Sequence, residues 1–74
     1  MNELDSIVLT TDLPEYGLTA GDIGTIVMVH GAGRGFEVEF VTLDGETITV
    51  VTLSAHQVRS VAHREIAHVR RVAA

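Results

Sequence analysis

Seven glycines and a single proline divide this 74-residue chain into short segments that are rich in valine, isoleucine and threonine. β-Branched residues favour strands, whereas glycine and proline interrupt regular structure and mark turns. Breakers at this spacing are typical of an all-β domain. We expect strands in the segments 6–11, 22–30, 36–42, 46–53 and 58–61.

The most specific local signal is the Asp44-Gly45 pair in the middle of a predicted hairpin over 36–53. A two-residue loop would mix apolar and polar side chains on one face, whereas a three-residue loop over 43–45 separates them. We therefore predict a type I turn in which Gly45 is left-handed and forms a glycine bulge. The expected cross-strand pairs are Thr42–Glu46, Phe40–Ile48, Val38–Val50, Phe36–Thr52, Glu39–Thr49 and Glu37–Val51.

The remaining segments complete a fold prediction. Pro14 and two glycines make 12–21 an irregular loop, and Gly24 indicates either a bulge or a close backbone approach. The segment 54–57 is expected to form one 3₁₀ turn capped by Ser54. We predict an all-β, small SH3-like, partly open barrel of about five strands over 1–61, with one 3₁₀ turn. The expected core is Ile7, Leu9, Leu18, Ile23, Ile26, Val27, Val29, Val38, Phe40, Ile48, Val50 and Val58.

Charge is distributed unevenly along the chain. Residues 1–50 carry nine acidic side chains and one arginine, whereas 51–74 carry four arginines and one glutamate. We therefore expect 62–74 to be a basic C-terminal tail that packs on the barrel or on a partner. Its apolar spacing fits either a helix or an extended chain, and we favour an extended, partly packed one.

Composition excludes several classes of function. The chain has no cysteine, which removes disulfides, thiolate metal sites and cysteine nucleophiles. A net charge of -5 disfavours binding to nucleic acid. No stretch is apolar enough to span a membrane, and the acidic N-terminus is unlike a signal peptide, so we expect a cytoplasmic protein.

No chemical motif for catalysis or cofactor binding is found. His63 and His68 are five residues apart, which suits metal chelation on neither a helix nor a strand. The glycine-rich segment 31–35 precedes a strand, and the chain lacks the lysine of a phosphate loop. Its serines lack the context of a nucleophile. We expect no enzyme activity, no cofactor and no metal.

Several short motifs together resemble a known family. They are Leu13-Pro14, Gly17-Leu18, Gly21-Asp22-Ile23-Gly24-Thr25-Ile26-Val27, Phe36-Glu37-Val38-Glu39-Phe40, Asp44-Gly45, Val51-Thr52-Leu53 and Glu65-Ile66-Ala67-His68-Val69-Arg70. Over residues 4–72 the chain resembles a family of small bacterial proteins of similar length, catalogued as a domain of unknown function. The resemblance implies an SH3-like barrel without an assigned activity. Because some members are encoded beside small toxin-like proteins, it also implies an antitoxin-like role.

We therefore expect a protein-binding module whose partner is another protein, with a homodimer as one form of the complex. SH3-like barrels bind partners through their first loop and open edges, and the hairpin's outer face is more apolar than a solvated face requires. The alternatives are an RNA- or ribosome-associated accessory module and a structural subunit of a larger enzyme. The candidate contact residues are Glu15, Tyr16, Leu18, Val41, Leu43, Val51, Leu53, Arg70 and Arg71.

Overall fold

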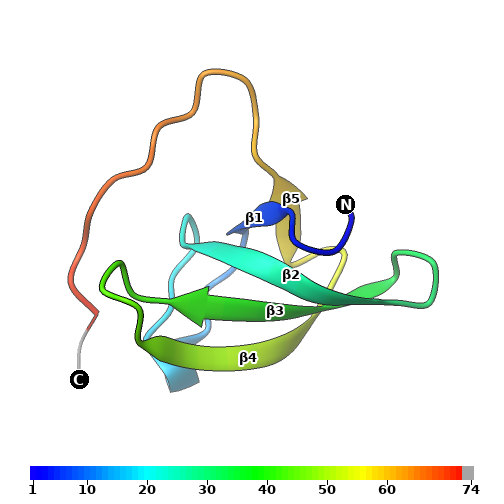
Figure 1. Ribbon diagram of the computed structural model, residues 1–74, viewed down its shortest axis with the longest axis horizontal. Helices are drawn as coiled ribbons and strands as arrows, with labels where there is room; N and C mark the ends of the chain where they lie inside the picture. The colour runs from blue at the N-terminus through cyan, green and yellow to red at the C-terminus, as the bar shows by residue number, and fades with distance from the viewer. Residues whose placement is uncertain (73–74) are drawn as a thin grey trace.

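The computed structural model describes residues 1–72 and contains one antiparallel sheet of five strands (Figure 1). The strands are β1 (Ser6–Leu9), β2 (Ile23–His30), β3 (Gly35–Val41), β4 (Thr47–Ser54) and β5 (Val58–Ser60). Their order in the sheet is β4-β3-β2-β1-β5, so β4 and β5 are edges and the barrel is not closed. The all-β prediction with five strands is confirmed. Over the described residues, no helix has the length and apolarity needed to cross a membrane.

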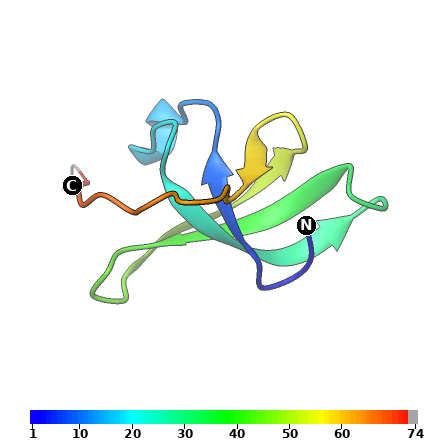
Figure 2. The ribbon, with the colours of Figure 1, turned by 90° about the horizontal axis from the view of Figure 1, so that it is seen from above.

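The strongly twisted sheet wraps around a single apolar core (Figure 2). The core cluster consists of Ile7, Leu9, Leu13, Leu18, Ile26, Phe36, Val38, Phe40, Leu53 and Val58, with Val29, Ile48 and Val51 partly buried against it. Three residues expected in the core, Ile23, Val27 and Val50, are instead about half exposed. Val27 is the extra residue of a bulge between β2 and β3, which turns its side chain outward.

The β3–β4 hairpin has the predicted turn. The Thr42 amide donates to the Glu46 carbonyl over 2.8 Å, and the Gly45 amide donates to the Thr42 carbonyl over 3.0 Å. Gly45 has a φ of 95°, as expected for a left-handed residue in a three-residue loop. The prediction for residues 43–45 is therefore confirmed.

Beyond the turn, the predicted register is wrong by one residue. A second bulge places Val41 opposite Thr47 but Phe40 opposite Thr49, so that Ile48 is the extra residue on β4. The observed pairs are Phe36–Leu53, Glu37–Thr52, Val38–Val51, Glu39–Val50 and Phe40–Thr49. Because one added residue exchanges the faces of a strand, Val51 and Leu53 point inward and Val50 points outward.

The 3₁₀ turn, η1, spans Pro14–Tyr16 rather than the predicted 54–57. Proline suits the first position of such a turn because its fixed φ is already helical and it needs no hydrogen-bond acceptor. Gly17, with a φ of 69°, ends the turn. Between β4 and β5 there is instead a simple turn, in which the Gln57 amide donates to the Ser54 carbonyl over 3.0 Å. The Gln57 side chain, not that of Ser54, caps it by accepting the Ser54 amide.

The chain beyond β5 is extended, as favoured from the sequence. Residues 61–72, here named the tail, contain neither strand nor helix, and their only turn lies at His63 and Arg64. The tail arches away from β5 (Figure 1) and returns to the body at the loop before β2, where Arg70 contacts Asp22 and Gly17. Residues 73 and 74 of the predicted 62–74 segment lie outside the described residues.

Candidate partner-binding surface

The tail begins with a turn that a single carboxylate holds together. Glu65 accepts the Ala62 amide over 2.6 Å and receives two hydrogen bonds from the Arg59 guanidinium, of 2.8 and 2.7 Å. The hydrogen bonds from Arg59 and then from Ala62 lower the pKa of Glu65 to about 2. The start of the tail is thereby tied to the end of β5.

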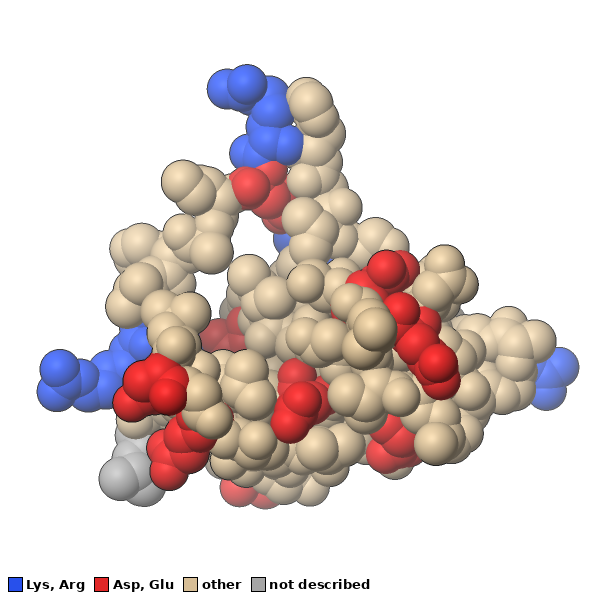
Figure 3. All heavy atoms as spheres, in the orientation of Figure 1, with Lys and Arg blue, Asp and Glu red and all other residues tan. Residues whose placement is uncertain are grey.

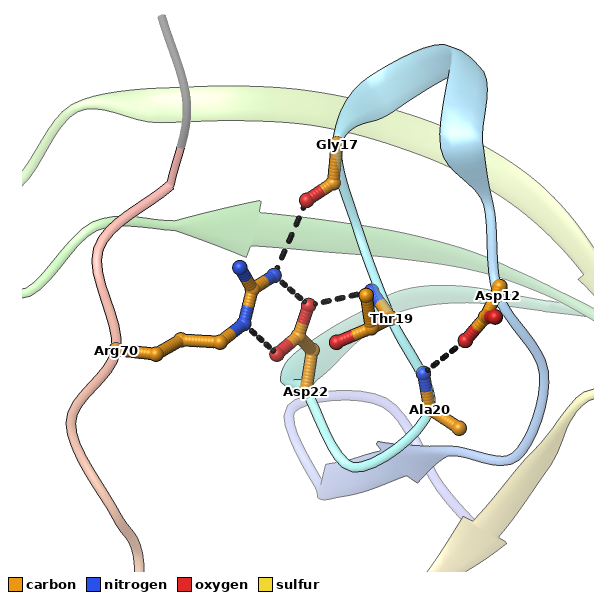
Figure 4. A network of polar contacts seen from close by, with 6 residues as sticks. All are labelled: Asp12, Gly17, Thr19, Ala20, Asp22 and Arg70. Atoms are coloured by element: carbon orange, nitrogen blue, oxygen red, sulfur yellow. Dashed lines mark hydrogen bonds and ion pairs between the residues drawn. The ribbon is translucent and has the colours of Figure 1, made fainter.

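Near its other end, the tail is fixed to the body by Arg70 (Figure 4). Arg70 Nε donates to Asp22 Oδ1 over 2.8 Å, while Nη2 donates both to Asp22 Oδ2 and to the Gly17 carbonyl, the latter over 3.1 Å. A planar guanidinium matches a carboxylate in this paired arrangement, which gives the contact a defined geometry. We call this contact the Arg70 clamp.

Hydrogen bonds within the body position the Asp22 carboxylate for its contact with Arg70. The Thr19 amide donates to Asp22 Oδ2 over 2.8 Å, and the Ala20 amide donates to Asp12 Oδ1 over 2.9 Å, which together fix the 17–22 loop (Figure 4). Burial alone would raise the pKa of Asp22, but the hydrogen bonds from Arg70 and Thr19 and the charge of Arg70 outweigh it. The pKa of Asp22 therefore lies below its ordinary value, and the carboxylate is ionised at neutral pH.

Between these two attachments the tail stands away from the sheet and encloses an open hollow of about 1070 Å³. The opening between tail and body is visible in the space-filling view (Figure 3). Its apolar lining includes Tyr16, Ile23, Val41, Leu43 and Ile48 on the body and Val61, Ile66, Val69 and Val72 on the tail. Leu43 on the body is 92% exposed and Ile66 on the tail is 94% exposed, so both side chains are in contact with solvent.

Charge around the hollow has a distinct pattern. Asp44 and Glu46 of the β3–β4 turn line it on the body side, and Arg71 lines it on the tail side. Acidic side chains spread over the body in this view, while basic ones stand out on the tail and at the opposite tip of the molecule (Figure 3). The lining also contains two ion pairs, Arg59 with Glu65 and Arg70 with Asp22, so its charges without an ion-pair partner among the described residues are Asp44, Glu46 and Arg71.

The residues expected to contact a partner fall into two groups. Tyr16, Val41, Leu43, Arg70 and Arg71 all line the hollow, and Glu15 is exposed in η1 next to it.

The other group lies on the core side. Leu18 and Leu53 are each 2% exposed, and Val51 is half-buried against the core. The expected outer-face position of Val51 and Leu53 is wrong because of the β4 bulge. Leu18 is buried as a member of the core cluster, although it also lines the hollow.

Sequence reasoning missed Asp22, Ile23, Ile66 and Val69 as parts of this surface. For Ile66 and Val69 a signal existed, since both are large apolar residues in a segment with no predicted cover. For Asp22 none existed, because its partner Arg70 is 48 residues away.

A separate polar cluster lies where β2, β3 and β4 run side by side. Glu37 Oε2 is 2.8 Å from His30 Nε2 and accepts the Thr52 hydroxyl over 2.6 Å. The hydrogen bond from Thr52, followed by that from His30, lowers the pKa of Glu37. In the part of the chain that the structure describes, no group of three or more His, Cys, Asp or Glu side chains is arranged to hold a metal ion.

Comparison with known proteins identifies the body of the molecule. No curated protein and no solved structure matches the chain. Residues 3–60, from the N-terminal segment to the last residue of β5, match the family model described as a domain of unknown function, DUF4926. The match stops where the tail begins, so the expected resemblance over 61–72 is not part of it. The chain belongs to the DUF4926 family.

Proposed function

We propose that this protein is a non-enzymatic binding module that receives an apolar segment of another protein in the hollow between tail and sheet. The observation that supports this function is the concave apolar surface itself, with Leu43 and Ile66 almost fully exposed on its two sides. Exposed apolar patches that are rimmed by polar residues are typical of interaction sites.

Charge refines the kind of partner. Asp44 and Glu46 lie at the margin of the hollow, and the body of the molecule is strongly acidic. Complementary charge favours association and fixes the register of a bound segment. The best-fitting partner therefore presents apolar side chains flanked by arginine or lysine.

The finer proposals follow the family resemblance. We propose a bacterial, cytoplasmic SH3-like module, consistent with five antiparallel strands and one 3₁₀ turn, that acts as the antitoxin-like partner of a small protein encoded beside it. The RNA-associated alternative is weaker, because Arg59 and Arg70 are both engaged in ion pairs with carboxylates. Arginines that bind phosphate need to be available to it.

The test is affinity capture of the neighbouring gene product by the full chain and by two matched variants. Leu43→Asp places a charge on the apolar surface without touching the core, since Leu43 is fully exposed. Leu4→Asp makes the same change at another exposed leucine that is not part of the hollow. We expect Leu43→Asp to weaken binding at least about tenfold, because burying a leucine contributes roughly 1.5–3 kcal/mol.

Leu4→Asp is expected to bind like the unchanged chain. Equal affinity of all three proteins for the captured partner would contradict the assignment of the hollow, and absence of any captured protein would contradict the antitoxin-like role.

A further inference from the structure

Among the described residues, the hydrogen bonds and ion pairs that hold the tail lie at its two attachments. Glu65 holds its start and Arg70 holds its end, while Ile66 and Val69 between them are 94% and 74% exposed. A segment of this length gains little by arching over its own sheet, because its apolar side chains remain in water.

The Arg70 clamp can form whether or not Arg70 and Asp22 belong to the same copy of the chain. Arg70 recognises a carboxylate and a carbonyl, of Asp22 and Gly17, that hydrogen bonds within the body already hold in place. The same guanidinium of a second copy would find the same acceptors. Exchange of identical segments is a low-cost route to dimers, since each copy keeps the contacts it had.

The turn at the base of the tail supplies a hinge. Arg64 has a φ of 62°, in the left-handed region that a residue with a side chain adopts only at a cost. Opening the turn 62–65 would release this conformation and direct the tail away from its own body, at the cost of the hydrogen bond from the Ala62 amide to Glu65. Short hinge segments under strain favour exchange between copies.

We propose that the tail is exchanged between two copies of the chain, so that Arg70 of each binds Asp22 of the other. The dimer has two hollows, each made from the sheet of one copy and the tail of its partner. This inference goes beyond the proposed function, because it concerns which copy supplies the tail and holds whether or not a different protein binds.

The test is the mass of the protein in solution, measured by sedimentation from micromolar to millimolar concentration. We compare the unchanged chain with Arg70→Asp, Asp22→Arg, their equimolar mixture, and the control Arg71→Asp. Arg71 is the adjacent exposed arginine and forms no ion pair with any described residue. In the mixture, Arg70 of one variant can bind Asp22 of the other, and the two substituted side chains meet with opposite charges.

We expect a dimer for the unchanged chain and for Arg71→Asp, monomers for each clamp variant alone, and a dimer again in the mixture. A monomer mass for the unchanged chain at every concentration would overturn the proposal, as would a dimer that Arg70→Asp leaves intact. Circular dichroism checks the folding of each variant. If Asp22→Arg does not fold, Arg70→Asp against Arg71→Asp still decides, because both changes lie in the exposed tail. Loss of partner capture by Leu43→Asp is measured separately, so the two proposals can fail independently.

Discussion

Gly45 illustrates how one backbone conformation fixes a turn. Its φ of 95° is unfavourable for any residue with a Cβ, yet a Cβ built there would meet nothing within 4 Å. The constraint is therefore purely conformational. Local turn chemistry of this kind is readable from sequence, because Asp44-Gly45 and the flanking alternation lie within a few residues of each other.

Gly45→Ala is predicted to lower the free energy of unfolding by roughly 1–2 kcal/mol, the cost of a left-handed conformation for alanine. Urea denaturation measures the change. Gly35→Ala is the control, because Gly35 is not left-handed and its added Cβ would lie 3.6 Å from the Leu53 carbonyl, an ordinary contact. Equal midpoints for Gly45→Ala and the unchanged protein would contradict the role given to this residue.

The Arg70 clamp, unlike the turn at Gly45, could not be predicted from neighbouring residues in the sequence. Arg70 was expected to contact a partner or the body, but nothing near it in the chain identifies Asp22 as its acceptor. The pairing depends on how the 17–22 loop folds, which in turn depends on hydrogen bonds such as that from Ala20 to Asp12. A contact between residues so far apart follows from the fold and leaves no local pattern.

At the scale of strands, the elements were predictable and their registers were not. Alternating β-branched segments and the glycines between them mark five strands in the right places. The bulges at Val27 and Ile48 have no such signal, because both residues are ordinary strand formers. Each bulge exchanges the two faces of its strand beyond it, which explains why Leu53 is in the core and Val50 is not.

Gly24 of β2 lies directly against side chains of β3. A Cβ there would lie 2.6 Å from Val38 Cγ1 and 2.9 Å from Phe40 Cε1, both far inside normal contact. We predict that Gly24→Ala lowers the free energy of unfolding by roughly 1–3 kcal/mol through overpacking. Combining it with Val38→Ala removes the nearest clashing atom, so the double variant should lose less than the sum of the two single losses.

The control is a second double-mutant cycle, which combines Gly45→Ala with Val38→Ala. A Cβ added at Gly45 would contact no atom within 4 Å and therefore not Val38, so the losses in free energy of unfolding should add. If the losses of Gly24→Ala and Val38→Ala also add, the clash between an added Cβ at Gly24 and Val38 is not the cause of the destabilisation, and the prediction is wrong.

At the scale of the whole molecule, an acidic body carries a basic tail that is attached at both ends and leaves an apolar space beneath it. The uneven charge was visible in the sequence, and it favoured a tail lying on its own body. The hollow was not visible, because it arises from the arch of the tail over the sheet rather than from any residue pattern. The exchange of tails depends on the Arg70 clamp, whereas the proposed binding function rests on the apolar surface of the hollow.

The most direct test of this account is the {¹H}-¹⁵N nuclear Overhauser effect of the tail amides, compared with the amides of the strands. At neutral pH we expect residues 66–72 to be nearly as ordered as the strands. Arg70→Gln should make them mobile, and Arg71→Gln should not.

The pKa of Asp22 is lower in the folded protein than its ordinary value of 3.8, so the clamp contributes fully to stability above that pH. Its contribution is then lost as the pH falls through the lower, folded value, and the tail of the unchanged protein should become mobile there. Tail amides that are already mobile at neutral pH, and that do not respond to Arg70→Gln, would contradict the account.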